Sequence, residues 1–305
     1  MLLTGNKTAA HAARLAEVEY IGAYPITPQS EIVETLAQWV SEGVMRARFV
    51  NFESEHSMIT AVGAASLAGV RAFTATSSQG LFYAFEALYT VSGWRAPIVL
   101  VNVSRGVGMP MILQVEHGDV LAARDSGFIQ LHAESCQEVL DLILLGYRVG
   151  EDPKVLLPVL VNMDGFVLSF AREPVEMPEV EEVRDFLPKY RRPKPLDGSE
   201  PVVYGPTLTD GVAYLFFKYG MHKAMLEAGK VFEEASKDFG DRFGRYHEPI
   251  EGNWLDDAEI AIISSNSFTT SIRSAVRRLR ERGVPVGLLK LKMICLLYTS
   301  DAADE

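Results

Sequence analysis

Four short polar segments follow apolar runs within the first 110 residues, and they contain the side chains best suited to chemistry. The segments are Tyr24-Pro25-Ile26-Thr27-Pro28, Glu53-Ser54-Glu55-His56-Ser57, Ser77-Ser78-Gln79-Gly80 and Ser104-Arg105-Gly106. Together they supply a hydroxyl, a carboxylate that can hold a proton, small hydrogen-bond donors and a guanidinium. Such a set could bind a polar ligand and move a proton if the fold brings the four segments to one edge.

Each of these side chains also has an ordinary structural explanation. Thr27 and Ser54 could cap helices, and Glu55 could stabilise the positive end of a helix dipole. Arg105 could form an ion pair with an acidic neighbour, and His56 could be a packed residue. The position of all four segments after predicted parallel strands favours a site, because ligands of open parallel sheets bind outside the carboxyl ends of the strands.

The elements that would position these segments alternate between strand and helix up to about residue 164, as in βαβ units. The predicted strands are apolar almost throughout, which is typical of parallel strands covered on both faces. They are residues 19–24, 48–52, 71–76, 97–103, 128–132 and 155–162. The sequence therefore predicts an α/β fold for residues 1–170, with a parallel sheet flanked by helices.

Four helices are predicted between these strands. The first would have Thr27 as its N-cap and Pro28 in the first helical position, and the second would run from a cap at Ser54 to Gly69. The others are residues 80–91 and 137–149. The second helix is rich in alanine and glycine, so we expect it to pack closely against the sheet or a partner chain.

The pattern changes beyond residue 170. Residues 171–256 are rich in proline and charged residues and are predicted to be a connecting segment with one exposed helix at 219–239. A strand at 258–264, a helix at 272–280 and a strand at 284–290 predict an incomplete second α/β domain over 257–292. Residues 293–305 do not continue that pattern, and we interpret them as a non-native tail of a truncated chain.

The composition excludes several classes of function. The 305 residues carry a formal net charge of −11, whereas a nucleic-acid surface needs clustered Lys and Arg. The two cysteines, Cys136 and Cys295, are too few for an iron–sulfur cluster or a disulfide scaffold, which fits a reducing cytoplasm. The sequence suggests neither a signal peptide nor a membrane span, so we expect no membrane role.

Common nucleotide and metal motifs are also missing from the sequence. There is no G-x-x-x-x-G-K-[ST] run, no G-x-S-x-G elbow and no pair of histidines four residues apart. Tyr-Pro-Ile-Thr-Pro stands where a glycine-rich dinucleotide fingerprint would follow the first strand. We therefore predict no metal site on this chain and disfavour a stand-alone nucleotide-binding module.

Five separated segments resemble, in order, the alpha subunit of pyruvate:ferredoxin oxidoreductases, which belong to the 2-oxoacid:acceptor oxidoreductase family. They are GAYPITPQSEIVE (22–34), ESEHSMITAVGAASLAG (53–69), TATSSQGL (74–81), ARDSGFIQL (123–131) and EDPKVLLPVLVNMDGF (151–166). The resemblance extends to about residue 292. It implies the pyrimidine-binding domain of a thiamine diphosphate enzyme that converts pyruvate and coenzyme A to acetyl-CoA, CO2 and reduced ferredoxin.

The resemblance also implies that this chain is inactive without partners. The thiamine diphosphate site would be shared with a beta subunit that holds Mg²⁺ against the diphosphate, and the Gly-Asp-Gly motif needed for that task is missing from this sequence. Iron–sulfur clusters would likewise lie on partner chains, with beta, gamma and delta subunits completing the complex and ferredoxin accepting the electrons.

By resemblance, Glu55 matches the catalytic glutamate. Hydrogen-bonded to N1′ of the aminopyrimidine, it would favour the imino tautomer, which removes the proton from C2 of the thiazolium. An apolar site should raise the pKa of this carboxyl group. Glu53, two residues earlier, is the competing candidate.

The same resemblance assigns the substrate contacts. Thr27 matches the residue that hydrogen-bonds the substrate, and Arg105 matches the one that binds its carboxylate, for which the planar guanidinium is suited. Tyr24 and Pro25 are expected beside the cofactor.

Two alternatives remain open. Residues 109–119 and 168–170 differ from the pattern expected of pyruvate enzymes, so the substrate could be a branched-chain 2-oxoacid such as 2-oxoisovalerate. The chain could also be a non-catalytic scaffold of such a complex, although a scaffold needs none of Thr27, Glu55 and Arg105.

Overall fold

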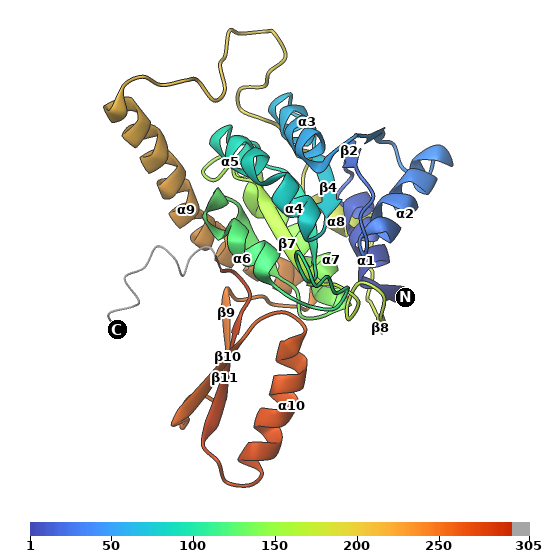
Figure 1. The fold of residues 1–305 in the computed structure, drawn as a ribbon, viewed down its shortest axis with the longest axis vertical. Helices are drawn as coiled ribbons and strands as arrows, with labels where there is room; N and C mark the ends of the chain where they lie inside the picture. Colours follow the sequence, from blue (N-terminus) through green and yellow to red (C-terminus); the bar gives the residue numbers. More distant parts are fainter. Residues whose placement is uncertain (295–305) are drawn as a thin grey trace.

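The computed structural model describes residues 1–294, and its centre is a six-stranded parallel sheet (Figure 1). The strand order is β3-β2-β4-β5-β7-β6. The strands are β2 (Tyr20–Ala23), β3 (Arg48–Asn51), β4 (Ala72–Thr76), β5 (Val99–Ser104), β6 (Ile129–His132) and β7 (Val159–Asp164). The predicted fold class and all six predicted strands are confirmed.

Helices cover both faces of this sheet. The first face packs on α1 (Gly5–Leu15), α2 (Ser30–Ser41) and α7 (Cys136–Gly150), and the second on α3 (Glu55–Leu67), α4 (Gln79–Tyr83), α5 (Phe85–Gly93) and α6 (Gly118–Ala122). Side chains alternate between the faces, so Val99, Val101 and Val103 of β5 enter the first core and Leu100 enters the second. Burial on both faces explains why these strands are continuous apolar runs.

Close packing of α3 against the sheet and α5 confirms the expectation from its small residues. A Cβ on Gly22 of β2 would lie 2.5 Å from the Val62 side chain, and a Cβ on Gly63 would lie 2.6 Å from Val91. Glycine is therefore needed at both positions for α3 to approach its neighbours. The cap predicted for this helix is also present, since the Ser54 hydroxyl accepts a hydrogen bond from the Ser57 amide.

The predicted start of the first helix is wrong. Helix α2 begins at Ser30 after Gln29, and Thr27 lies before it, joined to Pro28 by a cis peptide bond. Residues 26–29 form a turn in which the Gln29 amide donates to the Ile26 carbonyl at 3.0 Å. Thr27 therefore belongs to a loop and caps no helix. The predicted helix at 80–91 is likewise two helices, α4 and α5, separated at Ala84.

Several elements were not predicted. Strand β1 (Leu2–Thr4) pairs antiparallel with β8 (Arg172–Pro174), and α8 (Val180–Phe186) and β9 (Ile250–Asn253) follow. Helix α9 (Gly211–Phe243) is longer than the predicted helix at 219–239, and its second half is exposed on one face only. Phe232 and Phe239 of that half are fully buried in the first core.

A smaller α/β unit lies below the main sheet in Figure 1. It contains β10 (Ile260–Ser264), α10 (Phe268–Arg280) and β11 (Val286–Leu291), with β10 and β11 parallel and β9 antiparallel to β11. Of the predicted tail at 293–305, only Met293 and Ile294 are among the described residues. Met293 is buried and bridges Leu131 of β6.

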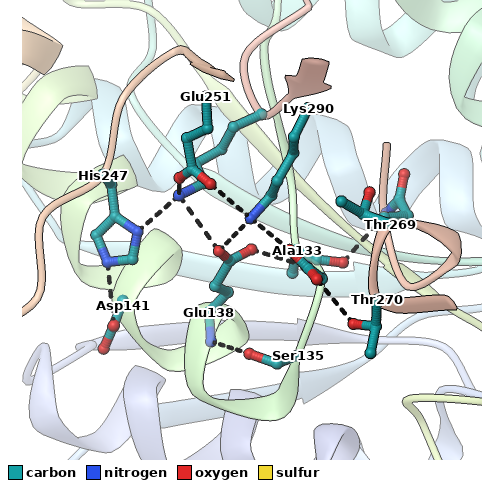
Figure 2. Close-up of polar contacts among 12 residues, drawn as sticks. Ala133, Ser135, Glu138, Asp141, His247, Glu251, Thr269, Thr270 and Lys290 are labelled. Carbon is teal, nitrogen blue, oxygen red and sulfur yellow. Dashed lines mark hydrogen bonds and ion pairs between the residues drawn. The ribbon is translucent and has the colours of Figure 1, made fainter. Parts of the chain in front are cut away.

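A buried ionic cluster joins the smaller unit to the main sheet (Figure 2). Lys290 of β11 lies 2.5 Å from Glu138 of α7 and 2.8 Å from Glu134, and its side chain is only 1% exposed. Lys292 pairs with Glu251 and lies 2.8 Å from Nδ1 of His247. Burying these charges together places the β10–α10–β11 unit against the start of α7.

Within residues 1–294, no helix is both long and apolar enough to cross a membrane.

Candidate active site

The four polar segments meet at the carboxyl edge of the sheet, after β2, β3, β4 and β5. The Arg105 Nε donates to the Thr27 carbonyl at 2.8 Å, and its Nη1 donates to the Gln79 side chain at 2.7 Å. Gly80, next to Gln79, lies against Glu55, since a Cβ at Gly80 would stand 2.4 Å from the Glu55 Oε1 atom. The structure therefore places Thr27, Arg105 and Glu55 around one turn, residues 77–80.

Glu55 is a buried carboxyl group at the start of α3. It is only 4% exposed, and no other side chain hydrogen-bonds it within the described part of the chain. Burial raises the pKa of Glu55, although its own backbone amide opposes the shift. The group is thus disposed to hold a proton at higher pH than an exposed glutamate would.

Glu53 has the opposite environment. Its side chain is exposed, and the Ser57 hydroxyl donates to it at 2.5 Å, which lowers its pKa. A solvated, hydrogen-bonded carboxylate prefers its ionised form. Of the two candidate glutamates, only Glu55 faces the turn between β4 and α4.

Glu55, Thr76 and Gly80 are packed closely together. Only glycine allows this approach, because a Cβ at Gly80 would stand 2.4 Å from the Thr76 Oγ1 and from the Glu55 Oε1. The Thr76 hydroxyl is fully buried and has no hydrogen-bond partner among the described residues. An unpaired buried hydroxyl is costly unless a ligand satisfies it. Hydroxyl and carboxyl together could bind an aromatic ring that carries both donors and acceptors.

Arg105 is held at the same edge by hydrogen bonds through two of its three guanidinium nitrogens. It is 5% exposed, and burial lowers its pKa. The Nε and Nη1 atoms bind protein acceptors, whereas Nη2 has no hydrogen bond to any residue of 1–294. A guanidinium remains charged in proteins, so this nitrogen can bind an anionic group.

The remaining predicted contacts border the same edge. The Thr27 side chain and Pro25 are exposed, and Tyr24 is half-buried against the second core. The Tyr24 carbonyl accepts a hydrogen bond from the Gln29 side chain at 2.8 Å, which holds the loop after β2. Thr27 thus presents its hydroxyl to the outside of the chain beside Arg105.

A buried polar layer behind the site was not predicted from the sequence. Asn102 of β5 donates to Asn162 of β7 at 2.8 Å and to Asp119 of α6 at 3.0 Å, and Ser104 donates to Asp119 at 2.8 Å. All of these side chains are fully buried. The signal was present in the sequence, because β5 and β7 share the run Val-Leu-Val-Asn followed by a polar residue two positions later.

Two other features lie away from this edge. Glu138, His247 and Glu251 lie close enough together to hold a metal ion (Figure 2). The Lys292 ammonium already contacts all three and takes the place of a cation. A cavity of about 720 Å³ lies at the opposite edge of the sheet, beside Glu19 and Arg71. It is remote from Glu55. The geometry favours the carboxyl edge, where a site shared with a partner chain would form no closed cavity.

Comparison with known families gives one match over most of the chain. Residues 11–237 match the family described as pyruvate flavodoxin/ferredoxin oxidoreductase, thiamine diP-bdg. That range contains every candidate site residue and the whole six-stranded sheet.

Similar proteins carry related names. The chain is 42% identical to the pyruvate synthase subunit PorA of Methanothermobacter thermautotrophicus over 292 residues, which are 96% of this chain and 76% of that protein. It is 42% identical to the PorA of Thermotoga maritima over 95% of this chain and 74% of that one. The ketoisovalerate oxidoreductase subunit VorA of Pyrococcus horikoshii is 39% identical over 95% of this chain and 74% of its own length.

A solved structure has the same fold. It is a 2-oxoglutarate:ferredoxin oxidoreductase from Magnetococcus marinus with 2-oxoglutarate, coenzyme A and succinyl-CoA bound, and it aligns with a TM-score of 0.75 at 21% identity. The alignment covers all of this chain and 55% of that chain.

Proposed function

The chain belongs to the pyruvate flavodoxin/ferredoxin oxidoreductase family with its thiamine diphosphate-binding domain, and from this we propose that it is the alpha subunit of a pyruvate:ferredoxin oxidoreductase. It would provide the pyrimidine side of the active site for oxidative decarboxylation of pyruvate with coenzyme A. The observation that carries the proposal is the buried Glu55 carboxyl group packed against Gly80, on the same edge as Arg105.

The side chains of Glu55 and Thr76 suit the aminopyrimidine ring of thiamine diphosphate. Glu55 would hold a proton against a ring nitrogen, and the Thr76 hydroxyl would gain the partner that it lacks in the chain alone. Gly80 allows the Glu55 carboxyl group and the Thr76 hydroxyl to lie together against the turn. Tyr24 and Pro25 would border the cofactor from the loop after β2. When bound, thiamine diphosphate supplies a nucleophilic ring carbon and an electron sink for decarboxylation.

Arg105 and Thr27 would orient the substrate. The uncommitted Nη2 of Arg105 can bind the carboxylate of a 2-oxoacid, and the bond from Nε to the Thr27 carbonyl fixes the plane of the guanidinium. The Thr27 hydroxyl, exposed beside it, can donate to a substrate oxygen. Holding the substrate at two points directs its carbonyl toward the cofactor, which is how positioning accelerates such a step.

The rest of the catalytic machinery would lie on partner subunits. We assign Mg²⁺ and the diphosphate to a beta subunit and the iron–sulfur clusters to other chains, with gamma and delta subunits completing the complex and ferredoxin accepting the electrons. The sequence contains two cysteines. Cys136 is buried, and burial with the nearby Glu173 raises its pKa to about 12, so it is a poor cluster ligand.

The test is reconstitution of the complex. Co-expression with beta, gamma and delta partners should give viologen reduction that depends on pyruvate, coenzyme A and thiamine diphosphate. Calorimetry on the same complex should show cofactor binding. A complex that binds no thiamine diphosphate would contradict the proposal and support a scaffold role instead.

One alternative substrate has a specific observation behind it. VorA is 39% identical to this chain, close to the 42% identity of the PorA protein of Methanothermobacter thermautotrophicus, so a branched-chain 2-oxoacid is the second candidate. The same assay separates the two, since a kcat/KM higher for 2-oxoisovalerate than for pyruvate would reassign the substrate.

A further inference from the structure

The turn between β4 and α4 has an unusual backbone at Ser78. Its φ is 48° and its ψ is −112°, a combination that glycine adopts readily and other residues rarely do. Gln79, which contacts Arg105, and Gly80, which lies against Glu55, follow directly. A relaxed Ser78 would therefore move both contacts at once.

Few groups hold this turn in place. The Ser77 hydroxyl donates to the Val103 carbonyl at 2.7 Å, and the Ser78 hydroxyl donates to the Gly106 carbonyl at 3.0 Å. The Ser78 backbone amide donates to the Oδ2 of Asp119 at 3.1 Å. Asp119 is thus the side chain that binds the backbone of the strained residue directly.

Asp119 is itself fixed from several sides. It is fully buried at the start of α6 and accepts hydrogen bonds from Asn102, Ser104 and the Val120 amide, in addition to Ser78. No Lys, Arg or His side chain within residues 1–294 forms an ion pair with it. A buried carboxyl group without an ion-pair partner lowers the stability of the folded state. Packing of the core does not require such a group, so Asp119 needs another explanation.

We propose that Asp119 is a positioning residue for the reaction: it holds the Ser78 backbone so that Gly80 lies against Glu55 and Gln79 contacts Arg105. This inference rests on the proposed function for its effect on the reaction. Its structural part, the hold on the turn, can be tested on the full chain without any activity.

The first experiment measures hydrogen exchange of the full chain by mass spectrometry. Asp119→Ala should speed exchange about tenfold or more in the peptide that covers residues 77–84, because the Ser78 amide loses its acceptor. Gln130→Met is the matched control. It removes another buried hydrogen bond to α6, from Gln130 to the Val120 carbonyl, without touching the turn. It should leave the 77–84 peptide unchanged.

The second experiment uses the reconstituted complex. Asp119→Ala should lower kcat/KM for the 2-oxoacid about tenfold to a hundredfold, with KM raised through Arg105 and kcat lowered through Glu55. Asp119→Asn, which keeps a carbonyl oxygen for the Ser78 amide, should lose less. Adding Ser78→Gly to Asp119→Ala should recover about threefold or more, because glycine adopts this backbone without support.

The outcomes separate the two hypotheses. Unchanged exchange at 77–84 in Asp119→Ala would overturn the inference even if the complex is a working oxidoreductase. Faster exchange with unchanged kcat and KM would also overturn it, since the turn would not matter to the reaction. An inactive wild-type complex with the expected exchange result would support the hold on the turn while contradicting the proposed function.

Discussion

Replacing Lys290 by methionine should weaken the junction between the main sheet and the smaller α/β unit. The Lys290 ammonium lies 2.8 Å from Glu134, 2.5 Å from Glu138 and 3.2 Å from Glu251, and the side chain is almost completely buried. Methionine keeps most of the volume and removes the charge. The three carboxylates would then share Lys292 and Arg273 alone.

The size of the effect follows from burial. Removing one partner of a buried ion pair costs about 3–5 kcal/mol, because the other charge stays buried without compensation. Two cations remain near the carboxylates, so we expect the lower end, about 3 kcal/mol. With a urea m value of about 3 kcal/mol/M, the unfolding midpoint should fall by about 1 M.

Urea titration followed by circular dichroism measures this shift. Lys230→Met is the control, because Lys230 is exposed on α9 and, within residues 1–294, pairs only with Glu227 of the same helix. It should not move the midpoint measurably. Equal midpoints for Lys290→Met and the unchanged chain would refute the idea that the ionic cluster holds the two units together.

Three further predictions concern the site and the cluster. Gly80→Ala should abolish thiamine diphosphate binding by the complex, measured by calorimetry, because its Cβ would displace the Glu55 carboxyl group and the Thr76 hydroxyl. Arg105→Lys should raise KM for pyruvate about tenfold or more and change kcat less, since lysine cannot bind a carboxylate through two nitrogens; an unchanged KM would remove Arg105 from substrate binding. Although burial opposes the shift, Arg273 and Lys290 lower the pKa of Glu134 from 4.5 to about 2. The stability from Glu134 is therefore complete above pH 4.5 and lost as the pH falls toward 2, and in urea titrations Glu134→Gln should flatten the change of midpoint across that range.

The strands and the edge that carries the site could be predicted because both depend on local sequence. A parallel strand buried on both faces must be apolar along its whole length, so β4, β5 and β7 stand out. The polar residues that follow such strands must then share one edge, which is where Thr27, Glu55 and Arg105 lie. Neither step requires knowledge of a distant contact.

The incorrect predictions depend on contacts between distant residues. Threonine is a residue type that often caps helices. Here, however, the Asn6 side chain of α1 donates to the Pro28 carbonyl at 2.8 Å, and the chain turns before α2 begins. Strand β1 exists because it pairs with β8, 170 residues later. Short pieces of three residues have no periodicity of their own, so a local pattern could not reveal them.

The role inferred for Asp119 was hidden for the same reason. In sequence it is one acidic residue at the end of the segment 109–119, and only the fold brings it to Ser78, 41 residues earlier. The contrast between Glu53 and Glu55 is similar. Their types are identical, and only the exposure of one and the burial of the other distinguish them.

The catalytic role proposed for Glu55 is tested by comparing Glu55→Gln with Glu53→Gln in the reconstituted complex. Both variants replace a carboxyl group by an amide, at positions two residues apart. Urea titration of each variant then shows whether their stabilities are equal. We predict that Glu55→Gln lowers kcat for pyruvate-dependent viologen reduction about a hundredfold or more, whereas Glu53→Gln stays within about twofold of the unchanged complex. Full activity of the Glu55→Gln complex would contradict the account.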